Sequence, residues 1–217
     1  MPRVITPTII ADFRNRLCDV AAELLVEQGM DGFNMRELAK RLRVSPMTAY
    51  RYFKDKNEIL AQLRSRGFAR LADVLDDAQE RFPNEAASVV RAYIRFALEE
   101  PITYRLMFDL FQPSGQEPAD LARHECRVRD AICDLAVEIA DAPAADGQRM
   151  GDVLWSALHG VVALHLSGKL DAASFQRSLA AAMRVFANAS LELQLLQPGW
   201  LDVTAADAGP AALSAAE

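Results

Sequence analysis

The sequence has 217 residues, of which only three are cysteines, and no two of these form a Cys-x-x-Cys pair. Cys18, Cys126 and Cys133 are too few and too scattered for the disulfide framework of a small extracellular protein. The most apolar stretch, Val153 to Leu166, is shorter than the roughly 20 residues that cross a bilayer. The N-terminus also lacks the apolar segment of a signal peptide. We therefore expect a soluble, cytoplasmic protein without a membrane partner.

Common enzyme motifs are missing as well. The sequence contains no glycine-rich phosphate loop, no Gly-x-Ser-x-Gly motif and no His-Glu-x-x-His motif. His124, Cys126 and Cys133 could suggest a metal site, but His124 is expected on another helix face and a fourth ligand is not evident. We interpret the cysteines as buried thiols and expect no metal, no cofactor and no enzyme activity. An enzyme is the weaker alternative.

Charge is distributed unevenly along the chain. Lys and Arg number 24 against 30 Asp and Glu, a formal net charge of -6. Residues 1–70 nevertheless carry a net charge of +5, and residues 71–217 carry -11. A basic segment on an acidic chain indicates an end that faces nucleic acid, and a solvated basic face is the alternative.

Strand signals are absent, and apolar residues recur at helical spacing. The pattern predicts an all-α protein. Thr6, Pro7 and Gly29 mark the start and stop of the first helix. The expected helices cover 7–28, 35–42, 46–53, 57–82, 84–100, 102–111, 119–140, 148–167 and 171–196. We expect a loop over 112–118 and a disordered tail over 198–217.

Residues 34–53 meet the requirements of a helix-turn-helix. Asn34 and Ser45 are predicted N-caps, and Pro46 suits the first position of the second helix. Since the turn between the helices is very short, they must cross steeply. The small core of this unit is expected to consist of Leu38, Ala39, Leu42, Val44, Ala49 and Phe53.

The segment from Phe33 to Leu60 resembles the head of the TetR family of bacterial transcriptional regulators. The resemblance rests on Tyr50-Arg-Tyr-Phe-x-x-Lys56, followed by Ile59-Leu60, and on the turn Ala39-x-x-Leu-x-Val-Ser45. The family usually has glycine where this chain has Arg43. Glycine takes a positive φ at little cost, so Arg43 must be strained there or end the helix differently.

This resemblance implies a DNA-binding head over residues 1–56. Arg51 is expected to bind guanine bidentately, Met47 and Thr48 to approach a thymine methyl, and Tyr50 and Tyr52 to bind phosphates. Packing is the alternative role for Tyr50, and simple solvation is the alternative for Arg51. The expected DNA contacts are Arg36, Arg43, Ser45, Pro46, Met47, Thr48, Tyr50, Arg51, Tyr52 and Lys56, the last aided by the dipole of its helix.

The helix expected over 148–167 is apolar on more than one side, so one stripe requires a partner. Together with the last helix it predicts a four-helix interface in a homodimer. Gly160 suggests a close helix crossing. The expected interface residues are Leu154, Ala157, Val161, Leu164, Phe175, Leu179, Met183 and Phe186.

Residues 57–197 are expected to form a helical effector-binding and dimerisation domain. Trp155, His159 and Gly160 resemble the Trp-His-Gly (WHG) subgroup of the family's C-terminal domains. The resemblance implies a small, apolar effector, although an aromatic stripe is commonly ordinary core. The candidate pocket residues are Tyr93, Phe96, Tyr104, Met107, Phe108, Phe111, His124 and Trp155. His159 is interpreted as a helix-packing residue.

The sequence therefore predicts a homodimeric, ligand-responsive regulator, a repressor that binds a palindromic operator in double-stranded DNA. Effector binding is expected to move the helix that joins the two domains, and so to change the separation of the two heads. A helical adaptor that no longer binds DNA is the alternative outside the enzymes.

Overall fold

A computed structural model describes residues 6–108, 117–141 and 143–187. Throughout these ranges the regular structure is helical, as expected, and no described helix is both long and apolar enough to cross a membrane. The helices are α1 (Pro7–Gly32), α2 (Met35–Arg41), α3 (Pro46–Tyr50), α4 (Lys56–Arg81), α5 (Ala86–Glu99), α6 (Pro101–Met107), α7 (Leu121–Ala140), the short 3-10 helix η1 (Ala144–Asp146), α8 (Gly147–Leu166) and α9 (Ala172–Ala187).

The predicted helix ends are mostly confirmed by cap geometry. Thr6 accepts a hydrogen bond from the backbone N–H of Ile9, and Asn34 accepts two from the first turn of α2. Gly29 has φ of +70° and interrupts α1 where the stop was expected. The third helix is shorter than predicted: α3 ends at Tyr50, and a turn leads on to α4.

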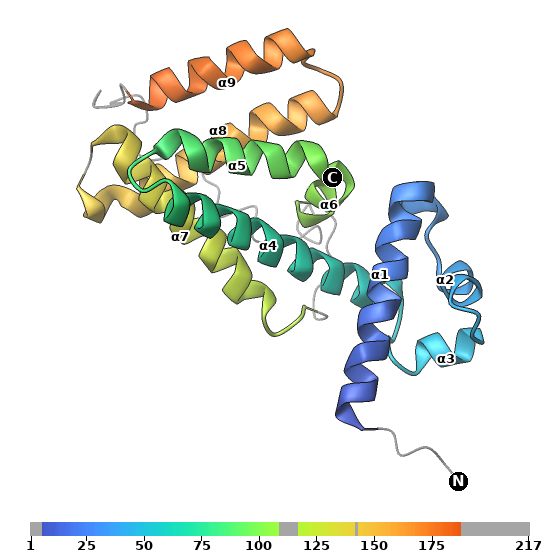
Figure 1. Ribbon diagram of the computed structural model, residues 1–217. Helices are drawn as coiled ribbons and strands as arrows, with labels where there is room; N and C mark the ends of the chain where they lie inside the picture. The colour runs from blue at the N-terminus through green and yellow to red at the C-terminus, as the bar shows by residue number, and fades with distance from the viewer. Residues whose placement is uncertain (1–5, 109–116, 142, 188–217) are drawn as a thin grey trace, which may run out of the picture.

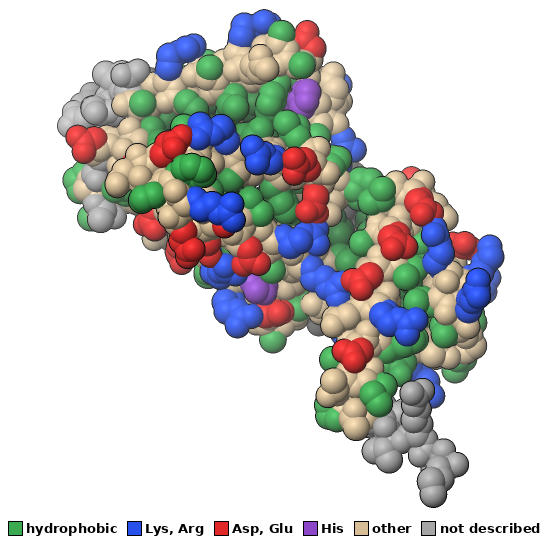
Figure 2. Space-filling view, viewed as in Figure 1, with side chains coloured by type: hydrophobic (Ala, Val, Ile, Leu, Met, Phe, Trp, Pro, Cys, Tyr) green, Lys and Arg blue, Asp and Glu red, His purple; other side chains and the backbone are tan. Residues whose placement is uncertain are grey.

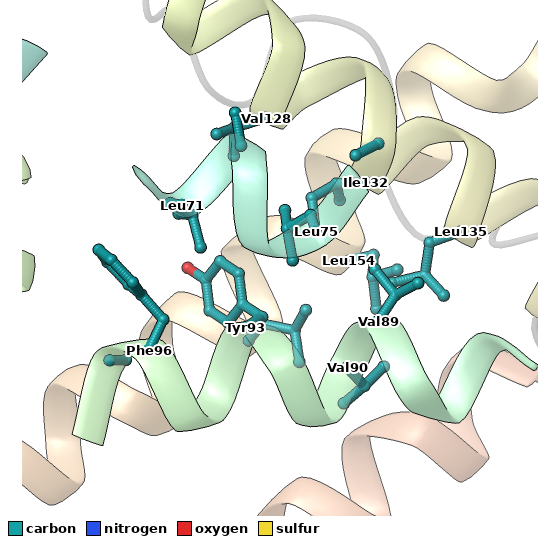
Figure 3. Close-up of a cluster of buried hydrophobic side chains, with 14 of the residues drawn as sticks. Leu71, Leu75, Val89, Val90, Tyr93, Phe96, Val128, Ile132, Leu135 and Leu154 are labelled. Atoms are coloured by element: carbon teal, nitrogen blue, oxygen red, sulfur yellow. The ribbon is translucent and has the colours of Figure 1, made fainter. Parts of the chain in front are cut away.

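Two parts are joined by α4 (Figure 1). We call α1 to α3 the head and α5 to α9 the body. The head encloses its own hydrophobic core, which includes the predicted Leu38, Ala39, Ala49 and Phe53. In the body, Leu71 and Leu75 of α4 face side chains of α5 and α7 (Figure 3).

The change from one core to the other lies inside α4. Ile59 and Leu63, in its first two turns, pack in the head core, and Phe68 is the first α4 residue of the body core. The expected division at residue 56 therefore does not coincide with the packing. The reason is that one continuous helix gives successive turns to different neighbours.

Helix α6 also contributes to both cores. Leu106 packs in the head core, while Tyr104 and Met107 pack in the body core. The α4–α6 crossing is close: a Cβ added at Gly67 would lie 2.8 Å from the Sδ atom of Met107. A side chain at position 67 would therefore force the side chain of Met107 to move.

Some predictions lie outside the described residues. These are Phe111, most of the loop expected over 112–118, the last part of the helix expected over 171–196, and the tail expected over 198–217.

Arg43 has the left-handed backbone expected for the position. Its φ is +56°, and the backbone N–H of the next residue, Val44, donates to the carbonyl of Ala39 at 3.0 Å. A side chain in this conformation costs about 1–2 kcal/mol relative to right-handed backbone. The turn thus keeps the positive φ that glycine usually adopts at this position, although the residue is arginine.

Replacing Arg43 by Gly should raise the free energy of unfolding by about 0.5–1 kcal/mol, since relief of strain outweighs the larger entropy of glycine in the unfolded chain. Urea titration with a far-UV circular dichroism readout measures the change. Arg43→Ala is the matched control, because it removes the same charge and keeps the strain. Equal stabilisation by both substitutions would contradict the explanation.

Candidate nucleic-acid interface

The outer face of α3 is built by its cap. Ser45 accepts a hydrogen bond from the backbone N–H of Thr48 at 3.1 Å, and the two hydroxyls lie 2.9 Å apart. This register buries Ala49 and turns Met47 outward with 74 % of its surface exposed. Arg51 follows at the C-terminal end of α3 and is also exposed. The predicted recognition face thus points away from the head core.

Unpaired positive charge accompanies this face. Arg36, Arg43, Arg51 and Lys56 are exposed, and within the described residues none of them has an ion-pair partner. Lys54, which was not predicted, shares these properties. Its position between α3 and α4 was the available signal. Lys and Arg side chains gather at the outer edge of the head beside α2 (Figure 2).

Three other basic residues of the head are neutralised, whereas Arg16 on α1 is exposed and has no ion-pair partner within the described residues. Arg14 pairs with Glu58, Lys40 with Glu37, and Arg41 with Glu27. Apart from Arg16, the unpaired positive charge of the described head therefore belongs to residues from α2 to the start of α4, which can attract phosphates.

Tyr50 and Tyr52, both expected to bind phosphates, differ in exposure. Tyr50 is 48 % exposed, so the alternative that it is a packing residue is wrong. Tyr52 is half-buried, with its ring centroid 4.5 Å from that of Phe13, so it is not one of the outward residues of α3. Helical spacing misplaced Tyr52 because α3 has already ended there.

The N-terminus of α4 does not offer a free anion site. Asp55 accepts hydrogen bonds from the backbone N–H groups of Asn57 at 2.9 Å and Glu58 at 3.0 Å. Glu58 accepts another from the backbone of Lys54. Two carboxylates therefore already compensate the positive end of the helix dipole. The expectation that the dipole helps Lys56 to attract a phosphate is wrong. Lys56 can attract phosphate only through its own charge.

Arg14 of α1 holds the end of the helix-turn-helix in place. Its guanidinium lies 4.0 Å from the ring centroid of Phe53, donates to the backbone carbonyl of Tyr52 and pairs with Glu58 at 2.9 Å. It was not predicted, because its partners are about 40 residues away and no local motif marks it.

The aromatic residues proposed for an effector pocket form a closely packed polar network in the body. The Tyr93 hydroxyl lies 2.7 Å from that of Tyr104 and accepts from Trp155 Nε1 at 3.1 Å. The Tyr104 hydroxyl also lies 2.9 Å from His159 Nδ1. Phe108 packs against His159 with ring centroids 4.4 Å apart.

Burial shifts the protonation of this network. It raises the pKa of Tyr93 to about 12 and raises that of Tyr104, so both phenols stay neutral. Burial also lowers the pKa of His159, which favours the neutral imidazole. The network can therefore donate and accept hydrogen bonds without charge.

The remaining pocket candidates divide. Phe96 and Met107 are buried in the body core. His124 lies beside Asp120 at the start of α7, with Nε2 and Oδ2 3.5 Å apart, and its Nδ1 is buried without a partner in the described structure. Cys126 is exposed, so the expectation that it is a buried thiol is wrong.

The outward face of α8 differs from the predicted dimer stripe. Leu154, Phe175 and Phe186 are buried in the body core, so they are not available to contact a second chain. Leu164 is 48 % exposed, whereas Ala157, Val161, Leu179 and Met183 are partly buried. Leu179 and Met183 pack against the body core.

Gly160 marks the centre of the outward face. No described atom lies within 4 Å of a Cβ built on it, so the close crossing expected there does not occur within the chain. Val153, with 62 % of its surface exposed, shares this side of α8. The predicted stripe was displaced because helical periodicity does not reveal which of two apolar sides faces the subunit core.

Two family models match the chain. One describes bacterial regulatory proteins of the tetR family and matches residues 17–63; the other describes the tetracyclin repressor-like C-terminal domain and matches residues 86–186. Together they cover most of the head and most of the body. The narrower resemblance to the Trp-His-Gly subgroup stays a prediction.

Individual relatives of the chain are also transcriptional regulators. The uncharacterized HTH-type transcriptional regulator YobS of Bacillus subtilis is 31% identical over 90 residues, covering 41% of this chain and 47% of YobS. The chain thus spans about half the length of the curated relatives it matches.

Solved structures of similar fold span much more of the chain. A protein with unknown function from Rhodococcus sp. RHA1 has a TM-score of 0.68 at 26% identity, covering 87% of this chain and 97% of that one. The complex of RolR with resorcinol has a TM-score of 0.58 at 19% identity, covering 83% and 90%.

Replacing His159 by Asn should reduce the loss of stability on acidification. Because the pKa of His159 is lowered on folding, the unfolded chain binds more protons as the pH falls below about 6.5, and the folded state loses stability there. The melting temperature of the wild type should therefore fall more between pH 7.5 and pH 5 than that of the variant.

Ser156→Ala, an exposed substitution on the same helix, is the control and should keep the wild-type pH dependence. An equal fall in melting temperature for the wild type and His159→Asn would contradict the inference that folding lowers the pKa of His159.

Proposed function

Because the chain belongs to the tetR family of bacterial regulatory proteins, we propose that it is a homodimeric repressor that binds a palindromic operator and releases it when a small, largely apolar effector binds the body. The observation that carries the proposal is the exposed face of α3, where unpaired basic side chains accompany outward Met47 and Arg51. Relatives with this head are regulators rather than enzymes.

In the proposed complex α3 enters the major groove. Arg51 binds a guanine through its two parallel donors, and Met47 and Thr48 approach a thymine methyl. Ser45 and Pro46 face the groove edge, while Tyr50 binds a phosphate. The charge that attracts the DNA backbone comes from Arg36, Arg43, Lys54 and Lys56. Tyr52 contributes to this surface mainly by packing against Phe13.

A second copy of the chain binds the other half-site of the operator. The outward side of α8, with Val153, Gly160 and Leu164, is apolar and has a glycine at its centre, which allows a partner helix to approach closely. Ala157 and Val161 flank this line and remain only partly buried. Two recognition helices then lie about 34–36 Å apart, one turn of DNA.

The effector acts through the cores shared by the two parts. The network of Tyr93, Tyr104 and Trp155 suits a small molecule with one or two polar groups among apolar ones. An effector that displaces Tyr104 also displaces Leu106, two residues along α6, which packs in the head core. A preference of about 1–3 kcal/mol for the altered state suffices to couple the sites.

Replacing Arg51 by Ala should weaken the free energy of binding to the preferred operator by about 1–3 kcal/mol and relax specificity at one base pair. Replacing Lys56 by Ala should weaken binding to all DNA sequences alike. It should also lower the slope of log affinity against log salt concentration by about one. Fluorescence anisotropy with the region upstream of the protein's own gene, at several salt concentrations, measures both effects.

Lys169→Ala, an exposed substitution in the turn between α8 and α9, is the matched control and should bind like the wild type. Absence of salt-sensitive binding by the wild type to any such fragment would leave a helical adaptor as the better interpretation. If Arg51→Ala and Lys56→Ala both bind like the wild type, the contact assignments are wrong.

Replacing Leu164 by Glu should convert the dimer to a monomer, because a carboxylate would be buried in an apolar interface. Loss of the second head should weaken operator binding about 100-fold or more. Sedimentation velocity measures the mass, and Val74→Glu, a partly exposed aliphatic position on α4, is the control. A wild-type monomer, or a dimeric Leu164→Glu variant, would refute this interface.

A further inference from the structure

A recess of about 820 Å³ lies between the head and the body. It is bounded by α1 on one side and by α4, the end of α5 and α6 on the other. Leu25, Leu63 and Leu106 belong to its lining, and all three pack in the head core. Hydrophobic side chains are visible at this boundary, with acidic and basic ones around it (Figure 2). The volume lies within the range of small-molecule sites, about 300–1,000 Å³.

Acidic side chains dominate the charged lining of the recess. Its two cations are already paired: Arg66 lies 2.8 Å from Asp19, and Arg70 pairs with Glu100. The full set of charged lining residues is Asp19, Glu23, Glu27, Glu99, Glu100, Arg66 and Arg70.

Two of the carboxylates have no ion-pair partner in the part of the chain that the structure describes. These are Glu23, on α1, and Glu99, at the C-terminal end of α5. Both are exposed, whereas Glu27 pairs with Arg41. Unpaired negative charge therefore borders the recess from the head and from the body.

We propose that this recess binds an amphipathic organic cation. Val26 and the partly buried Ile102 give the lining an accessible apolar surface, and the carboxylates of Glu23 and Glu99 attract a positive charge that lies between them. An anion of the same size would meet unpaired negative charge on both sides. The charge of the lining thus selects a cation among apolar molecules.

A cation bound here contacts both parts of the molecule. Glu23 moves with the head and Glu99 with the body, so the ligand stabilises the head orientation that brings both carboxylates close to it. Its effect on operator affinity rests on the proposed function, whereas its binding to the recess does not.

The probes are tetraphenylphosphonium and tetraphenylborate, which have nearly the same shape and opposite charge. Isothermal titration calorimetry on the full chain should give binding of the phosphonium, weakened by added salt, and much weaker binding of the borate. The double substitution Glu23→Gln and Glu99→Gln should weaken phosphonium binding about tenfold or more. Glu80→Gln, an exposed carboxylate of α4 outside the recess, should leave it unchanged.

A second variant tests the location independently. Val26 lines the recess and is 66 % exposed, so Val26→Arg should fold normally, add positive charge at the site and abolish phosphonium binding. Borate binding equal to that of the phosphonium, or phosphonium binding unaffected by the double substitution or by Val26→Arg, would overturn the proposal.

Operator binding separates this inference from the function on which it builds. A protein that binds its operator but not the phosphonium retains the proposed function and overturns the inference. A protein that binds the phosphonium in the recess but no operator supports the site and overturns the proposed function.

Discussion

Helix α6 packs into the cores of the head and the body at the same time, and the rest of the structure depends on this constraint. Leu106 on one side lies among head residues, and Tyr104 on the other lies in the body. Gly67 allows α4 to cross α6 so closely that a methyl group would collide with Met107. Because packed cores are dense, neither part can rotate without repacking this joint. A ligand on either side of α6 can therefore influence the orientation of the head.

The polar groups of the molecule are divided according to this arrangement. In the body, the buried hydroxyls of Tyr93 and Tyr104 form hydrogen bonds with each other and with the side chains of Trp155 and His159, so this network needs no charged partner. In the head, ion pairs neutralise Arg14, Lys40 and Arg41. They leave Arg43, in the turn before α3, and Arg51, at its C-terminal end, unpaired within the described residues. The chain is acidic overall, yet one surface is available for phosphates. The carboxylates at the recess are a separate negative surface at the joint.

Local sequence signals predicted much of the fold. Caps at Thr6, Asn34 and Ser45 act within three residues, so short segments contain all the information that they need. The left-handed backbone at Arg43 could be expected for the same reason, since the turn geometry is local. Most of the candidate DNA face followed from the position of α3.

What the sequence by itself determined was therefore the helices, most of their ends and most of the exposed face of the helix-turn-helix, because these depend on neighbours a few residues away. Tertiary structure decided which side of α8 faces outward, why Tyr52 packs while Tyr50 does not, and how α6 joins two cores. It also brought Glu23 and Glu99 to one recess from positions 76 residues apart. These features arise from contacts between segments distant in the chain, for which a single helical period contains no information.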